Sequence, residues 1–158
     1  MSGPELHPEI APLAGLLGTW EGEGQGDYPT IEPFTYREQV TFGHVGKPFL
    51  AYGQRTWSPE DGAPLHAETG YLRMPRAGRV ELVLAHPTGI VEVEEGAFDG
   101  SVVELSTSSV GLTATAKAVR SVRRRFVLAD DELTYDLWMA YGEIPETHHL
   151  HATLHRSA

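Results

Sequence analysis

The chain has 158 residues, no cysteine and a net charge of −10 with histidine neutral. This length suits a single domain, expected over residues 1–158, with a core large enough to need no covalent crosslink. The absence of cysteine excludes disulfides, thiolate metal ligands and a cysteine nucleophile, and the acidic charge argues against a nucleic-acid partner. Because neither a leader peptide nor a membrane-spanning apolar run is visible, we expect a cytoplasmic protein without a membrane partner.

The first predicted element is a short helix over residues 7–17. Apolar residues recur in it at helical spacing, and Gly18 follows as a stop signal. These apolar residues are Ile10, Leu13, Leu16 and Leu17. Because such a stripe needs a surface to cover, we expect the helix to rest on one end of a barrel.

From residue 19 onward, strand-like segments alternate with turn residues and the helical spacing disappears. We expect ten strands, over residues 19–27, 34–45, 49–57, 65–74, 79–86, 90–98, 101–108, 113–128, 132–141 and 148–156. Short connections favour antiparallel neighbours in sequence order, and closure removes exposed sheet edges. The sequence therefore predicts an all-β fold, an antiparallel up-and-down ten-stranded β-barrel of the calycin or lipocalin type, over residues 19–157. Such a barrel is wide enough to hold a small ligand.

Glycines crowd the first predicted strand at Gly18, Gly22, Gly24 and Gly26. In an extended strand every second residue points to the same face, so the last three would leave one face almost bare. A bare face admits another strand at a barrel corner or a flat ligand. A merely flexible or bulged strand stays open as the alternative.

Three further patterns bear on the interior of the barrel. The cluster Arg120, Arg123, Arg124 and Arg125 lies in a strand-like segment and is interpreted as a solvated strand face. His86 ends an apolar strand face beside a Pro-Thr-Gly turn, which predicts a position at a pocket mouth. Met139 shares its strand face with Leu133, Tyr135 and Leu137 and should point inward.

Histidines are concentrated near the C-terminus, where His149, His151 and His155 would share one strand face. This spacing permits a zinc site, but a run of histidines on an exposed strand is more often solvated. Neither a Gly-x-Ser-x-Gly elbow nor a phosphate-binding loop is present. A single histidine that ligates a haem iron beside an apolar wall fits the remaining features better.

A specific motif supports this direction. Residues 18–24 read Gly-x-Trp-x-Gly-x-Gly, formed by Gly18, Trp20, Gly22 and Gly24, and Tyr-Pro-Thr-Ile follows at residues 28–31. Together with segments at residues 66–73, 84–89, 115–117 and 149–154, this pattern resembles the nitrobindins, a family of haem-binding β-barrels. The matching segments keep the family's order and span nearly the whole chain.

The resemblance implies one ferric haem b per chain, in a pocket at one end of the barrel. It implies reversible binding of nitric oxide and isomerisation of peroxynitrite to nitrate, which would protect tyrosines from nitration. Haem, nitric oxide and peroxynitrite are therefore the expected partners, and a homodimer is left open.

The resemblance also assigns residues. His149 would be the catalytic residue and the axial ligand of the haem iron, with its second ring nitrogen donating to a backbone carbonyl or to water. Thr30 and Lys117 match positions of haem contact. Leu65, His66, His86 and Met139 match positions that line the pocket, and a distal role for either histidine stays open.

Strand alternation conflicts with the role of His149. Leu150, Ala152 and Leu154 should share the inward face, which would turn His149 outward. Either a bulge or a strand start reorients His149, or the haem lies at the rim of the barrel. We expect the rim position.

Two other functions fit the same barrel. One is a calycin-type carrier that binds haem or another apolar small molecule without catalysis. The other is a sensor of nitric oxide or haem. A Soret band would separate the haem protein from a carrier of other molecules, and peroxynitrite decay would separate the enzyme from the sensor.

Overall fold

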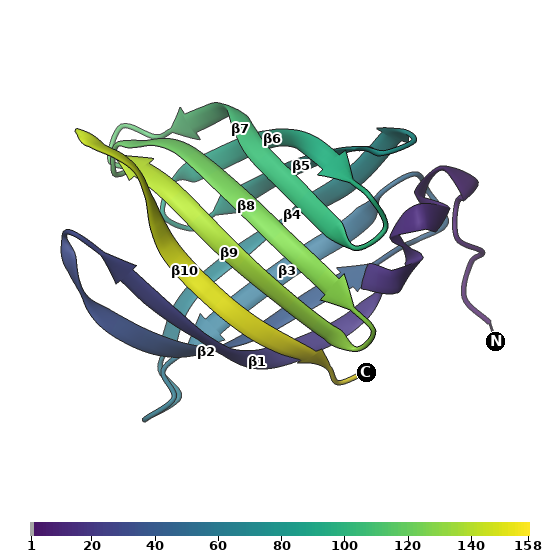
Figure 1. Cartoon of the computed structure of the whole chain (residues 1–158), viewed down its shortest axis with the longest axis horizontal. Helices are drawn as coiled ribbons and strands as arrows, with labels where there is room; N and C mark the ends of the chain where they lie inside the picture. Colours follow the sequence, from purple (N-terminus) through teal and green to yellow (C-terminus); the bar gives the residue numbers. More distant parts are fainter. Residues whose placement is uncertain (1) are drawn as a thin grey trace.

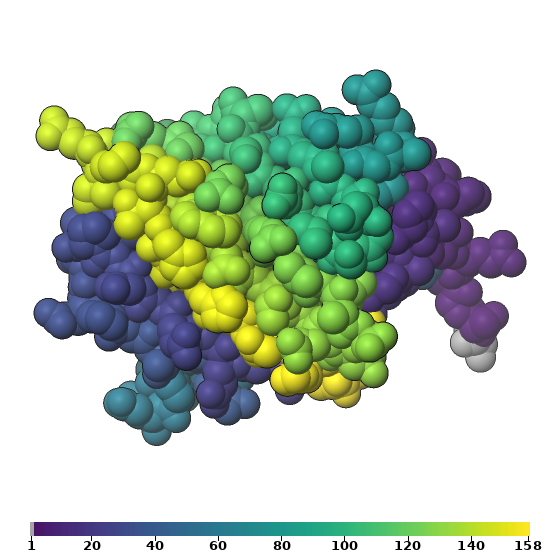
Figure 2. Space-filling view, in the orientation of Figure 1, coloured from purple at the N-terminus to yellow at the C-terminus, as the bar shows by residue number. Residues whose placement is uncertain are grey.

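Ten antiparallel strands close into a barrel in the computed structural model, which describes residues 2–158 (Figure 1). The strands are β1 (Gly18–Tyr28), β2 (Ile31–Gly43), β3 (Leu50–Trp57), β4 (Pro64–Arg76), β5 (Arg79–His86), β6 (Ile90–Phe98), β7 (Val102–Leu112), β8 (Val119–Ala129), β9 (Glu132–Tyr141) and β10 (Ile144–Arg156). Each strand pairs with its sequence neighbours, and β1 pairs with β10 to close the barrel. Figure 2 shows β10 between β9 and β1 on the visible face. The predicted up-and-down architecture is confirmed.

The predicted short helix is present as the 3₁₀ helix η1 (Pro8–Leu16). Its apolar residues Ile10, Leu13 and Leu16 are fully or almost fully buried in the barrel core, and the indole of Trp20 donates a 2.9 Å hydrogen bond to the Leu16 carbonyl. The helix therefore covers one end of the barrel, as expected (Figure 1). Within residues 2–158, no helix is both long enough and apolar enough to cross a membrane.

Several strand boundaries were predicted wrongly, and the second strand already begins at Ile31 and not at residue 34. The strand expected over residues 113–128 begins only at Val119, because residues 113–118 form a loop whose amides bond back within it, from Ala116 to the Thr113 carbonyl at 3.1 Å. The strand expected over residues 101–108 extends to Leu112, and Gly111 pairs with Val91 of β6. The final strand begins at Ile144 and not at residue 148.

The glycines of β1 lie at a crowded corner of the barrel. A Cβ at Gly22 would overlap the Thr153 carbonyl of β10, and one at Gly24 would overlap the ring of Tyr36. A Cβ at Gly26 would overlap the ring of Phe34. Neighbouring strands and aromatic rings therefore fill the bare face. Of the two occupants expected from the sequence, another strand or a flat ligand, the structure shows the strand.

Replacing Gly22 with alanine is expected to destabilise the barrel. The new Cβ meets the Thr153 carbonyl, which belongs to the backbone of β10, the strand paired with β1, and cannot rotate away. We expect a loss of about 2 kcal/mol or more in the free energy of unfolding, measured by urea denaturation. Gly43→Ala is the matched control, since a Cβ there meets nothing within 4 Å. Equal stability of the two variants would contradict the crowded-corner interpretation.

Candidate functional site

A cavity of about 1110 Å³ opens at the end of the barrel opposite η1. The apolar side chains of its lining include Ile31, Phe34, Leu65, Leu137, Met139 and Leu150, and the first three are exposed at the entrance. Its deeper wall is polar and includes Tyr36, Glu38, Tyr52, Glu68, Glu92, Arg124 and Tyr135. The volume lies slightly above the roughly 300–1,000 Å³ that small-molecule and cofactor sites occupy. The barrel thus offers a large ligand site with exposed apolar side chains at its entrance and a charged floor.

His149 lies in the wall of this cavity because of a β-bulge in β10. The register with β9 pairs His148 with Trp138 and then Leu150 with Leu137, so His149 is the extra residue. A bulge changes the direction of the side chain that it carries. The bulge explanation of the sequence analysis is confirmed, and both His149 and Leu150 line the cavity. The preferred alternative, a haem at the rim, stays a prediction.

The imidazole of His149 is held in one tautomer. Its Nδ1 lies 3.0 Å from the carbonyl oxygen of Asp27, and a carbonyl can only accept, so Nδ1 carries the proton. The β1–β2 register also shifts between Gly26 and Tyr28, beside this carbonyl. The ring of Tyr28 packs edge-on against His149 at 5.3 Å between centroids. Nε2 is left with its lone pair available to a ligand.

Burial lowers the pKa of His149 below its ordinary value, and the bond to the Asp27 carbonyl only partly offsets this. The neutral imidazole is therefore the dominant form at neutral pH. A neutral ring with one nitrogen anchored to a backbone carbonyl is the usual state of a metal-ligating histidine.

The other predicted site residues divide into two groups. Leu65, His66, His86 and Met139 line the cavity, as predicted from the pocket positions. Thr30 and Lys117 lie exposed on two loops at the open end, the β1–β2 turn and the β7–β8 loop, outside the cavity lining. Their contact with haem stays a prediction.

The floor of the cavity contains an ionic cluster around Arg124. Its guanidinium lies 2.7 Å from Glu68, 2.9 Å from Glu92 and 3.0 Å from Glu94. Arg124 is only 4% exposed, so its interpretation as part of a solvated strand face was wrong. Alternate residues of a strand share one face, and Val122, Arg124 and Phe126 of β8 are all buried. Arg124 therefore points into the barrel and not toward solvent.

The four buried carboxyls of this region differ in charge. Burial opposes ionisation of Glu68 and Glu92, but the adjacent Arg124 outweighs it and holds both pKa values below the ordinary range. Burial raises the pKa of Glu94 to about 9 and that of Glu38 to about 7. For Glu94, Arg124 only partly offsets the effect of burial, and the neighbouring Glu92 raises its pKa further.

Hydrogen bonds extend this cluster through three buried tyrosines. Tyr52 donates to Glu68 at 2.6 Å, and Tyr135 donates to Glu38 at 2.7 Å. The hydroxyls of Tyr36 and Tyr135 share a further bond at 2.8 Å. Sequence reasoning missed this network. Each carboxyl lies two residues from a buried neighbour on the same strand face, and this alternation could have indicated that the carboxyl points inward.

A model of one protein family, described as the THAP4-like, heme-binding beta-barrel domain, matches residues 9–156. The chain belongs to this family, the nitrobindins. Its resemblance to the family, first seen in the motif at residues 18–24, is thereby confirmed.

Individual relatives are similar to this chain over nearly its whole length. Peroxynitrite isomerase 2 of Mycobacterium marinum is 55% identical over 98% of each chain. Peroxynitrite isomerase 1 of Mycolicibacterium paratuberculosis is 56% identical, over 96% of this chain and 97% of its own. The crystal structure of Rv2717c from M. tuberculosis matches with a TM-score of 0.94 and 52% identity, covering 98% of this chain and 100% of that one.

The cavity of this nitrobindin fits a haem by its own chemistry. His149 offers one free nitrogen on a half-buried, neutral ring whose other nitrogen is anchored. The apolar entrance suits the face of a macrocycle, and a single imidazole is a sufficient axial ligand. His149 is therefore the residue that would hold the iron, while the charged floor lies deeper in the barrel.

Proposed function

We propose that this chain binds one ferric haem b through His149 and isomerises peroxynitrite to nitrate. The relatives from M. marinum and M. paratuberculosis are named peroxynitrite isomerases, which supports the reaction, and the haem-binding family supports the cofactor. The observation that carries the proposal is the bulged His149, anchored to the Asp27 carbonyl and lining a cavity of about 1110 Å³.

Bound ferric haem supplies the metal centre at which peroxynitrite rearranges, and the chain supplies the surroundings. His149 contributes a neutral imidazole, and the Asp27 carbonyl fixes its tautomer and increases the basicity of Nε2. The apolar entrance holds the macrocycle and limits the access of water. Thr30 and Lys117 contact the haem from the loops at the open end, and the positive charge of Lys117 favours an anionic ligand in an otherwise acidic protein.

The proposal extends to the physiological role implied by the chemistry. The same iron binds nitric oxide reversibly, and removal of peroxynitrite in the cytoplasm protects tyrosines from nitration.

Mixing hemin-loaded protein with peroxynitrite in a stopped-flow instrument tests the activity. We expect the decay rate to rise in proportion to the loaded protein, with nitrate as the product and with less nitration of added tyrosine. Protein without haem and hemin at the same concentration are the two controls. Decay no faster than with these controls would leave a haem carrier and contradict the enzyme proposal.

A further inference from the structure

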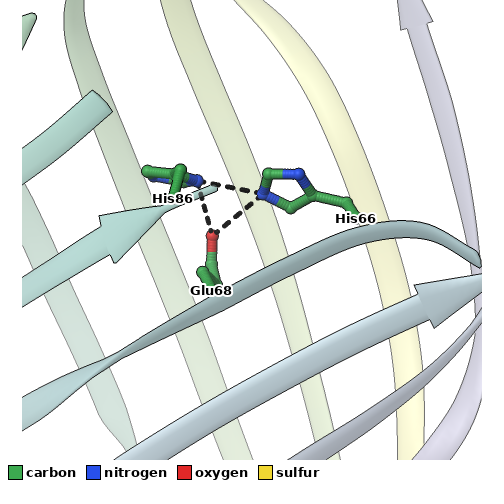
Figure 3. Close-up of side chains that lie close together, drawn as sticks. All are labelled: His66, Glu68 and His86. Carbon is green, nitrogen blue, oxygen red and sulfur yellow. Dashed lines mark hydrogen bonds and ion pairs between the residues drawn. The ribbon is translucent and has the colours of Figure 1, made fainter. Parts of the chain in front are cut away.

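Three potential metal ligands converge in the cavity wall on strands other than the one that carries His149. His66 and Glu68 are alternate residues of β4, and His86 ends the adjacent β5 (Figure 3). The β4–β5 register pairs Thr69 with Ala85 and brings the ends of the two strands together. Within residues 2–158, these three form the only group of three or more histidines and carboxylates whose ligand atoms lie within 4.8 Å of one another.

The spacing of the ligand atoms matches a tetrahedral metal site. Nε2 of His66 lies 2.9 Å from Nδ1 of His86 and 3.7 Å from Oε2 of Glu68, and Nδ1 of His86 lies 3.4 Å from the same Oε2. Ligands about 2.0–2.1 Å from a tetrahedral zinc ion lie roughly 3.3–3.4 Å from each other. The observed distances lie on both sides of this value, so small side-chain rotations would centre an ion.

Outer contacts orient each ligand as a metal site requires. Nε2 of His86 contacts the Glu92 carboxylate, which leaves Nδ1 to face His66. Oε1 of Glu68 accepts from Arg124 at 2.7 Å and from Tyr52 at 2.6 Å, whereas Oε2 accepts one longer bond from Arg124 at 3.4 Å and faces the two histidines. A carboxylate behind a ligating histidine is a typical outer-shell arrangement of zinc proteins.

Charge and access also favour a cation. Glu68 and Glu92 place two carboxylate side chains against the single guanidinium of Arg124. The His66 side chain is 34% exposed, whereas the side chains of His86 and Glu68 are 11% and 5% exposed. An ion bound here would therefore be reached from the cavity, and its fourth position would open toward that space.

We propose that His66, Glu68 and His86 form a binding site for a divalent transition-metal ion of the Zn²⁺ class, separate from the haem iron. Two imidazoles, one carboxylate and an open position are the ligand set of several catalytic zinc sites. The competing explanation is that the three side chains only satisfy one another through hydrogen bonds.

Zn²⁺ titration of the haem-free full-length chain, in competition with a chromogenic chelator, separates the two explanations. We expect one Zn²⁺ per chain, with His66→Ala weakening the affinity at least about 100-fold. Glu92→Gln should weaken it by roughly 10–100-fold, as removal of an outer-shell partner does. His66→Ala is the variant least expected to unfold the barrel, because its side chain lies at the cavity surface, and circular dichroism checks its fold.

Two controls locate the ion. His151→Gln removes the surface grouping of His148, His151 and Asp136 and should leave the affinity unchanged. His149→Ala should also leave it unchanged, which separates this site from the haem ligand. The proposal is overturned by the absence of saturable binding, by wild-type affinity in folded His66→Ala, or by loss of the ion in either control.

Discussion

Replacing His149 with alanine is expected to abolish the Soret band of iron-coordinated haem in the reconstituted protein. The substitution removes the neutral imidazole that the β10 bulge places in the cavity wall. We expect hemin affinity to fall by about 100-fold or more, beyond the roughly 10–100-fold effect of losing an outer-shell partner. Hemin titration followed by absorbance measures both effects.

Two neighbouring substitutions provide matched controls for His149. His148→Ala alters an exposed ring that bonds to Asp136 at 2.8 Å, so the Soret band should remain. Asp27→Ala should also keep it, because the anchor of His149 is the main-chain carbonyl and not the carboxylate. A normal Soret band in His149→Ala would refute the assignment. Loss of the band in His66→Ala would then indicate that His66 binds the iron.

Replacing Arg124 with methionine is expected to produce the largest loss of stability. The substitution leaves the carboxylates of Glu68 and Glu92 buried without their cation. Removal of one partner from a buried ion pair reduces the free energy of unfolding by about 3–5 kcal/mol. Urea denaturation measures this loss, and Arg124→Lys, which keeps the charge without the planar fork, should give an intermediate value.

Arg125 supplies the control for this experiment. It is the next residue of β8 but points outward, and its pair with Glu104 at 3.2 Å is exposed. Arg125→Met should therefore change stability by less than about 1 kcal/mol. If the two arginine variants lost equal stability, the buried cluster would have no special role.

The Arg124 variant should also respond to pH with a defined sign. Burial is the largest influence on the pKa of Glu68 and of Glu92, and without the guanidinium only His66 and His86 oppose it, so we expect both folded pKa values to rise above the ordinary value of 4.5. The folded variant then binds more protons than the unfolded chain, so its stability should fall as pH rises from about 5 to 8. In the wild type the two pKa values are lowered, so the stability that these groups contribute is lost only as pH falls below the ordinary value.

The architecture of the barrel was predictable because its signals are local and repeated. Alternating residues and turn residues mark eight of the nine connections well enough to give ten strands in sequence order. The exception is the β7–β8 connection. Gly111 has the appearance of a turn residue but lies in a strand, and residues 113–118 contain β-branched threonines yet form a loop.

The position of His149 in the cavity wall was not predictable from strand alternation. The resemblance points to His149, but a bulge adds one residue against the opposite strand and leaves no mark in the sequence, so alternation turned the ring the wrong way. Arg124 was misassigned because its partners lie on β4 and β6, far away in sequence. Local patterns cannot reveal an ion pair that exists only after the barrel closes.

The most direct test of the account is a crystal structure of the hemin-loaded protein. The account predicts iron bonded to Nε2 of His149, with Nδ1 still within hydrogen-bonding distance of the Asp27 carbonyl. Iron bonded to His66 or His86, or a haem bound with no bond to His149, would contradict it.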